Sequence, residues 1–183
     1  MSSAFRSRIE PSSGAFASNR ADMLRLVDAH RELEARAEAL SERRRPRFEE
    51  RGQLTPRERL ARLLDPGMPF LELHSLANYL VDDPDPATSV PGASLITGIG
   101  FVEGVRCMVW VDDSGIRAGA GTGGSLQKSL SILDLALRQK LPLVHLVESA
   151  GANLMAYRVE GWARGGGLST VDCRLREAVG YRL

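Results

Sequence analysis

Two loops of small residues contain the residue types whose spacing could do chemistry. The first, GAGTGGS, runs from Gly119 to Ser125 and leads into an apolar periodic segment that carries Lys128. Glycines let the backbone turn tightly and direct N–H groups at a ligand, and a helix N-terminus adds positive potential. Lys128 would lie about one turn into that helix, within reach of a phosphate or a carbonyl. The loop is neither a Walker loop nor a dinucleotide fingerprint, so ligand binding and a plain strand-to-helix turn remain equal interpretations.

The second loop, ESAGAN, runs from Glu148 to Asn153 and follows the apolar segment LPLVHLV. Loops at the carboxyl ends of buried strands are favoured binding places in α/β sheets. Small residues let a substrate approach the backbone, and backbone amides can receive an oxyanion. Ser149 could be a nucleophile, but its surroundings are not G-x-S-x-G and no histidine can be placed beside it.

Other polar side chains favour structural interpretations. His145 lies inside an expected strand, where a core or sheet-face role is favoured over catalysis. Asp112 and Asp113 end another strand, and neighbours on a strand point to opposite faces, so a shared carboxylate site is not expected. Two cysteines exclude a disulfide framework and a cysteine-based zinc site, and we expect no metal in this chain.

From residue 95 onward the pattern is α/β. Residues 94–101 and 105–111 predict two strands joined by a turn at Glu103-Gly104, the second strand being apolar enough for burial on both faces. Residues 141–147 predict a third strand. The helix between them should span about residues 125–139 and pack on the sheet through one face, formed by Leu126, Leu130, Leu133 and Leu137.

The first 94 residues are expected to be less regular. Residues 1–20 are polar and predict an irregular terminus, whereas 21–81 predict a helical extension. Its first helix, 21–45, is rich in charge and should end or kink at Pro46; a partner-facing arm and a solvated helix are both open. Thr55 and Glu58 predict a capping box for a second, short helix. Residues 82–94 are rich in proline and predict a surface loop.

Composition limits the possible partners. The 183 residues carry a net charge of +1, with 43% hydrophobic and 26% charged residues, which is ordinary for one globular domain. No global field attracts the chain to nucleic acid or to a membrane surface. No apolar run approaches the roughly 18 residues of a membrane span, and no signal-peptide core is present, so we expect a cytoplasmic protein.

Several motifs in order resemble the carboxyltransferase (β) subunit of biotin-dependent acyl-CoA carboxylases of the propionyl-CoA and methylcrotonyl-CoA type. The resemblance covers about residues 5–168. The matching segments are RGQLTPRERL (51–60), LLDPG (63–67), FLEL (70–73), GIG (98–100), VWVDD (109–113), GTGGSLQK (121–128), LPLVHLVESAGAN (141–153) and GGG (165–167).

The resemblance implies an α/β fold of the crotonase and Clp-protease type, in which ββα units wind into a superhelix. Residues 82–168 would form part of the first of two such domains, facing the acyl-CoA. Residues 169–183 depart from the family pattern as a divergent tail. We expect the superhelix to be incomplete here, through truncation or a shifted reading frame.

The resemblance also implies a reaction, in which a carboxyl group passes from carboxybiotin to the α-carbon of an acyl-CoA. Backbone amides at Ala150 and Gly151 would form half of the oxyanion hole. Biotin would be carried by a separate chain or domain, the partners would be acyl-CoA and a biotin carboxylase or carrier subunit, and the family forms homo-oligomers. Substrate contacts are implied at Gly123, Gly124, Lys128, Ser149 and Ala152.

Two alternatives remain open beside a carboxyltransferase part. Another crotonase-like enzyme, such as a hydratase or an isomerase, would lack the RGQLTPRERL segment. A non-catalytic remnant would fit the divergent tail, and we expect the chain alone to lack carboxyl transfer, because a second glycine-rich loop and the biotin-facing domain are not found in it.

Overall fold

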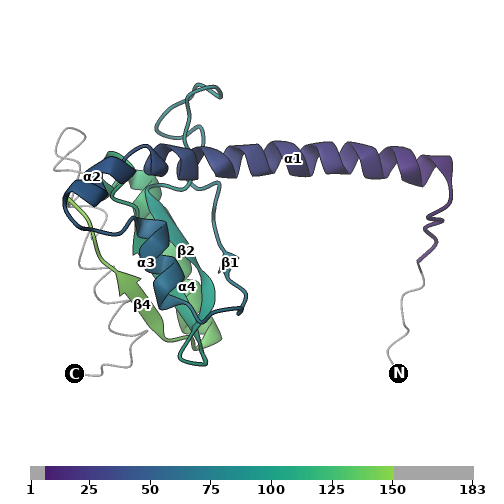
Figure 1. The fold of residues 1–183 in the computed structure, drawn as a ribbon. Coiled ribbons are helices and arrows are strands. Elements are labelled where there is room, and N and C mark those ends of the chain that lie inside the picture. The colour runs from purple at the N-terminus through teal and green to yellow at the C-terminus, as the bar shows by residue number, and fades with distance from the viewer. Residues whose placement is uncertain (1–6, 151–183) are drawn as a thin grey trace.

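A four-stranded sheet forms the centre of the chain in the computed structural model, which describes residues 7–150 (Figure 1). The strands lie in the order β1-β2-β3-β4, with antiparallel pairs β1–β2 and β2–β3 and a parallel pair β3–β4. The parallel pair directs the carboxyl ends of β3 and β4 to the same edge of the sheet. The strand bounds are Leu71–Glu72, Leu95–Val102, Val105–Asp112 and Leu143–Leu146.

The three strands expected from the sequence are confirmed, and β1 was missed because it contains only two residues. The β2–β3 turn is the expected pair Glu103-Gly104, and both residues have positive φ, as a two-residue hairpin with a type I′ turn requires. The carboxylate of Asp65 accepts both turn amides, at 2.8 and 2.7 Å. Burial on both faces of β3 begins only at Cys107, since Val105 and Arg106 are exposed.

Helix α4 (Gly123–Gln139) covers one face of the sheet, but of the four expected leucines only Leu133 is buried there. Leu137 is 43% exposed. The predicted packing face was therefore right for Leu133 and wrong for the other three leucines, because the buried face is rotated toward Ser125, Lys128, Ser129, Ile132 and Ala136. This face packs in a cluster of Leu95, Met108, Trp110, Ile132, Leu133, Ala136 and Leu141.

Helix α3 (Pro56–Leu63) covers the opposite face and confirms its predicted start. The Thr55 hydroxyl accepts from the Glu58 amide, while the Glu58 carboxylate accepts from the Thr55 amide at 2.8 Å. Pro56 occupies the first turn, where no N–H is needed. The second apolar cluster joins this helix to the sheet and contains Leu60, Ile96, Cys107, Val109 and Val111.

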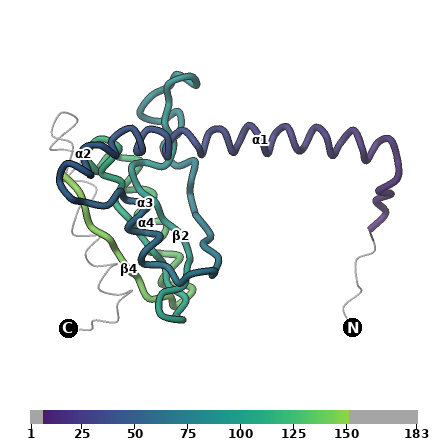
Figure 2. The backbone as a smooth tube through the Cα atoms, viewed as in Figure 1, coloured from purple at the N-terminus to yellow at the C-terminus, as the bar shows by residue number. Residues whose placement is uncertain are grey.

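Helix α1 (Gly14–Glu42) extends from the sheet into open space for much of its length (Figures 1 and 2). It begins at Gly14, so the prediction of an irregular terminus through residue 20 was wrong in its last part. The side chain of Ser13 caps its first turn, a signal that the polar composition of this region concealed. The helix ends before Pro46, as predicted, and α2 (Arg45–Glu50) follows.

The remaining elements complete the described residues. Residues 82–94 form no helix or strand, as expected, but the prediction of a surface loop fails for Ser89 and for 91–94, which are buried. A single 3-10 turn, η1 (Arg117–Gly119), precedes α4. No helix among residues 7–150 has the length and apolarity needed to cross a membrane.

Candidate functional site

The two loops singled out by their residue types contact each other at the carboxyl edge of the sheet. The Ser149 hydroxyl donates to the Gly119 carbonyl at 2.7 Å, and the Ala150 amide donates to the Ala118 carbonyl at 3.0 Å. Gly119 has φ +68°, and a Cβ there would collide with the carbonyl oxygen of Glu148. The close approach of the loops therefore requires glycine at this position.

Asp112 anchors the start of the second loop. Its carboxylate accepts the Glu148 amide at 3.0 Å and the Trp110 indole N–H at 2.9 Å, and lies 3.1 Å from His145 Nε2. Burial opposes ionisation of Asp112, but the hydrogen bonds from His145, Glu148 and Trp110 outweigh it and lower the pKa of this carboxyl. Asp112 is thus an ionised acceptor at the point where β4 passes into the loop.

His145 lies on the sheet face, as the sequence favoured. Its ring stacks on Trp110 with centroids 4.1 Å apart and an interplanar angle of 24°. β4 pairs with β3 so that these two residues are direct neighbours. The ring and Asp112 are too remote in sequence for periodicity alone to have paired them.

Arg59 reaches the same loop from α3 and was missed by sequence reasoning. Its guanidinium forms a 2.7 Å ion pair with Glu148 and lies 3.4 Å from the Asp112 carbonyl. A signal was present, since Arg59 lies in the RGQLTPRERL segment, one residue after the capping-box glutamate. That segment therefore has two roles, since it begins α3 and also places the Arg59 guanidinium beside the second loop.

The first glycine loop ends in a second capping box. The Thr122 hydroxyl accepts from the Ser125 amide, and the Ser125 hydroxyl accepts from the Thr122 amide. Gly123 is exposed with open space around its Cα, so a ligand can approach its backbone. Gly124 differs, because a Cβ there would collide with the Asn78 side chain.

Lys128 does not lie where a surface phosphate would meet it. The side chain is 2% exposed, and its ammonium donates to the carbonyls of Leu95 at 2.6 Å and Gly92 at 3.1 Å. Burial lowers its pKa to about 8. In this arrangement Lys128 ties α4 to the start of β2, so the expected phosphate contact does not fit its placement.

The expected oxyanion donors also need revision. The Ala150 amide already donates to Ala118, so it is not a free donor in this arrangement. Gly151 and Ala152 lie outside the described residues, as do the GGG segment 165–167 and the tail 169–183. Ser149 and Ala150 are thus placed at the junction of the two loops, while the Gly151 donor stays a prediction.

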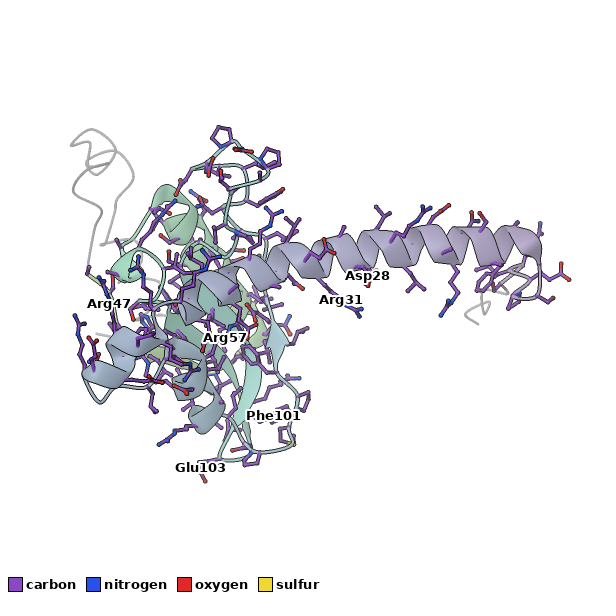
Figure 3. The ribbon with its side chains drawn as sticks, turned by 45° about the horizontal axis from the view of Figure 1, so that its top comes forward. Asp28, Arg31, Arg47, Arg57, Phe101 and Glu103 are labelled. Carbon is purple, nitrogen blue, oxygen red and sulfur yellow. The ribbon has the colours of Figure 1, made fainter. Side chains whose placement is uncertain are left out.

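Asp113 faces the other side of the sheet, as alternation predicts. It is 3% exposed, accepts the Ser41 hydroxyl at 2.6 Å and the Gly115 amide at 3.1 Å, and ties α1 to the body of the molecule. Burial raises its pKa despite the bond from Ser41. A cavity of about 340 Å³ lies here between α1 and the sheet, and Arg57 lies at its wall, near their junction (Figure 3).

Metal chemistry has no ligand set in this part of the chain. Among residues 7–150, no three His, Cys, Asp or Glu side chains gather as they would around a metal ion. Cys107 is buried, and burial raises the pKa of its thiol.

Comparison with known proteins places this geometry in a family. The model of the carboxyl transferase domain matches residues 47–175. The biotin-dependent 3-methylcrotonyl-coenzyme A carboxylase beta1 subunit of Mycobacterium tuberculosis is 41% identical over 130 residues, which are 70% of this chain and 24% of that protein. The mitochondrial propionyl-CoA carboxylase beta chain of Rattus norvegicus is 36% identical over 107 residues, 57% of this chain and 20% of that one.

Solved structures confirm the crotonase-like carboxyltransferase fold class. The geranyl-CoA carboxylase beta subunit of P. aeruginosa superposes with a TM-score of 0.81 at 42% identity, covering 94% of this chain and 31% of that one. A transcarboxylase 12S structure, at 22% identity and a TM-score of 0.67, covers 85% of this chain and 30% of that one and supports the fold alone. The chain spans about a quarter or less of the curated relatives it matches.

Proposed function

Since the chain belongs to the carboxyl transferase domain family, we propose that it forms the N-terminal, acyl-CoA-binding part of a biotin-dependent acyl-CoA carboxyltransferase. The observation that carries the proposal is the family match over residues 47–175, which includes both loops and the α3 segment that supplies Arg59. The relatives matched are β subunits of carboxylases that act on 3-methylcrotonyl-CoA, propionyl-CoA and geranyl-CoA. The proposed substrate is accordingly an acyl-CoA thioester.

The proposed role of this chain is to hold the thioester while a carboxyl group is added to its α-carbon. Removal of the α-proton leaves an enolate, whose oxygen carries the developing negative charge. Donors aimed at that oxygen lower the barrier, and the loss of one typically costs about 2.7–4 kcal/mol. Because the Ala150 amide is paired with Ala118, we assign the donor on this loop to the Gly151 amide.

The proposed substrate contacts follow from exposure. Gly123 offers an exposed backbone at the N-terminus of α4, where amide groups and the helix dipole favour anionic groups such as the phosphates of CoA. Gly124 supports this turn by packing against Asn78. Ser149 and Ala152 are proposed to flank the thioester, and Lys128 acts indirectly, by holding α4 against the start of β2.

Biotin and the partner chains enter the proposal through the relatives. Their names describe biotin-dependent enzymes and β subunits, so we propose that the biotin group comes from a separate chain or domain and that a biotin carboxylase or carrier subunit is a partner. Carboxybiotin would supply the carboxyl group. We further propose that copies of this chain associate with each other and that the protein works in the cytoplasm.

Acyl-CoA binding by the 183-residue chain tests the proposal. We expect isothermal titration calorimetry to detect binding of propionyl-CoA or 3-methylcrotonyl-CoA. Gly119→Ala should weaken binding at least tenfold, because the added methyl group pushes the two loops apart. Gly104→Ala is the matched control, since it also has positive φ but has open space around it.

Two results would refute the proposal. One is the absence of heat with every acyl-CoA tested, from a chain whose circular dichroism shows it to be folded. The other is equal weakening by the Gly119 and Gly104 variants, which would trace the effect to backbone strain rather than to the loop contact.

A further inference from the structure

We infer that Asp112 and Arg59 are positioning residues that hold Glu148 from two sides and thereby fix the course of the loop that begins there. The inference rests on the proposed function in one respect, since it takes the loop that begins at Glu148 to be the one that meets the thioester. It assigns a positioning task to two charged side chains, Asp112 and Arg59. It also explains why an N-terminal helix segment belongs to the site.

Asp112 holds the backbone of Glu148. The carboxylate is 4% exposed and accepts the Glu148 amide at 3.0 Å. The Trp110 indole, itself 7% exposed, and His145 occupy its other oxygen, at 2.9 and 3.1 Å. A buried carboxylate with donors on both oxygens has little freedom to move, so the amide that it accepts is fixed with it.

Arg59 holds the side chain of Glu148. The two groups are 2.7 Å apart, and their side chains are only 24% and 28% exposed, so solvent screens the pair less than it would a surface pair. A second contact, from the guanidinium to the Asp112 carbonyl at 3.4 Å, ties α3 to the end of β3. The capping box at Thr55 and Glu58 fixes the first turn of α3, in which Arg59 lies.

The next two residues are held by the first glycine loop. Ser149 donates to Gly119 and Ala150 donates to Ala118, so three consecutive residues are anchored by four contacts from three different segments. Removal of one anchor at Glu148 should therefore loosen the loop locally without unfolding the sheet. A misplacement of about 1 Å in a substrate-positioning segment can cost about a hundredfold in reaction rate.

Hydrogen exchange of the Glu148 and Ala150 amides, followed by NMR on the full 183-residue chain, tests the inference without any ligand. We expect Arg59→Gln and Glu148→Gln each to speed exchange at these amides at least fivefold, and the double variant to be no faster than the faster single one. Arg59→Lys should retain most of the protection. Arg62→Gln is the matched control, being an exposed arginine on the same helix.

The core amides of β2 and β3 separate positioning from a general loss of stability. We expect their exchange to match that of the Arg62→Gln control. Equal acceleration of core and loop amides would overturn the inference, and so would unchanged loop exchange in both the Arg59 and Glu148 variants. Asp112→Asn adds a third comparison. Should this variant unfold the chain, the variants at Arg59 and Glu148, which are more exposed, still decide whether the loop is held.

A second arm uses acyl-CoA. If wild type binds, Arg59→Gln and Glu148→Gln should weaken binding about tenfold or more, with Arg62→Gln unchanged. If wild type does not bind, the proposed function fails while the exchange result still decides whether Arg59 and Asp112 hold the loop. Normal acyl-CoA binding by a variant whose loop amides exchange faster would overturn only one part of the inference, the link between the loop and the thioester.

Discussion

On the α4 face of the sheet, β3 presents Met108, Trp110 and Asp112, whereas on the α3 face it presents Val109, Val111 and Asp113. Both faces are apolar along the strand and end in a buried carboxylate. The neighbours differ: Asp112 is surrounded by donors from β3, β4 and the loop, whereas Asp113 bonds to Ser41 of α1 and to the Gly115 amide. Because side chains alternate along β3, two adjacent carboxylates have different roles: Asp112 holds the loop at Glu148, and Asp113 attaches α1.

The largest expected effect tests the packing on the α4 face. Ile132 is completely buried between α4 and the sheet, while Leu137 on the same helix is 43% exposed. Ile132→Ala should lower the free energy of unfolding by about 2–5 kcal/mol, through lost burial and the cavity that remains. Leu137→Ala should change it by only about 0.5 kcal/mol. Urea unfolding of both variants would disprove this face assignment if the order were reversed.

Because of Lys128, the free energy of unfolding should change with pH in the alkaline range. Burial lowers its pKa from the ordinary 10.5 to about 8, so between these values the unfolded chain binds more protons than the folded one. Stability should therefore rise with pH through this window, by about 3 kcal/mol at most. The measurement is the difference in unfolding free energy between wild type and Lys128→Met from pH 7 to about 10.5. A difference that does not change with pH would show that the ammonium is not buried.

Asp112 and Asp113 should respond to acid in opposite directions. The pKa of Asp112 is lowered in the folded chain. The stabilisation that Asp112 contributes is therefore present above the ordinary carboxyl pKa and is lost as the pH falls through the pKa of the folded state. The pKa of Asp113 is raised by burial, so the folded chain binds more protons and stability increases as pH falls through that window. At neutral pH, Asp112→Asn should cost about 1.5–3 kcal/mol, because hydrogen bonds to a charged group are lost.

Urea titrations between about pH 3 and pH 6 compare Asp112→Asn and Asp113→Asn with wild type. The first variant should lose less stability than wild type as the pH falls, and the second should lose more. The same sign for both variants would show that the two faces do not differ in the way described above.

Local signals predicted the elements well, and the sites only in part. The capping box at Thr55, the turn at Glu103-Gly104 and the separation of Asp112 from Asp113 follow from interactions within a few residues, which a sequence displays directly. The Arg59–Glu148 pair spans 89 positions and depends on how α3 crosses the sheet. The placement of Lys128 was missed for a related reason. Its acceptors lie 36 and 33 positions away, with Gly92 in the segment expected to be a surface loop and Leu95 at the start of β2.

The smallest expected effect compares the two helices at their starts, since each face of the sheet is covered by a helix with a threonine capping box. Thr55→Ala on α3 and Thr122→Ala on α4 each remove a side-chain acceptor for an amide that has no partner within the helix, and each should cost about 1 kcal/mol. Thr→Ser at either position is the matched control, because the hydroxyl acceptor is retained.

Thr55→Ala should also speed exchange of the Ala150 amide, since α3 positions Arg59 beside Glu148, whereas Thr122→Ala acts on that amide only through the first glycine loop. Thermal unfolding measures the cost and NMR exchange the local effect; an Ala150 amide that responds to neither variant would show that the helix starts do not govern the loop.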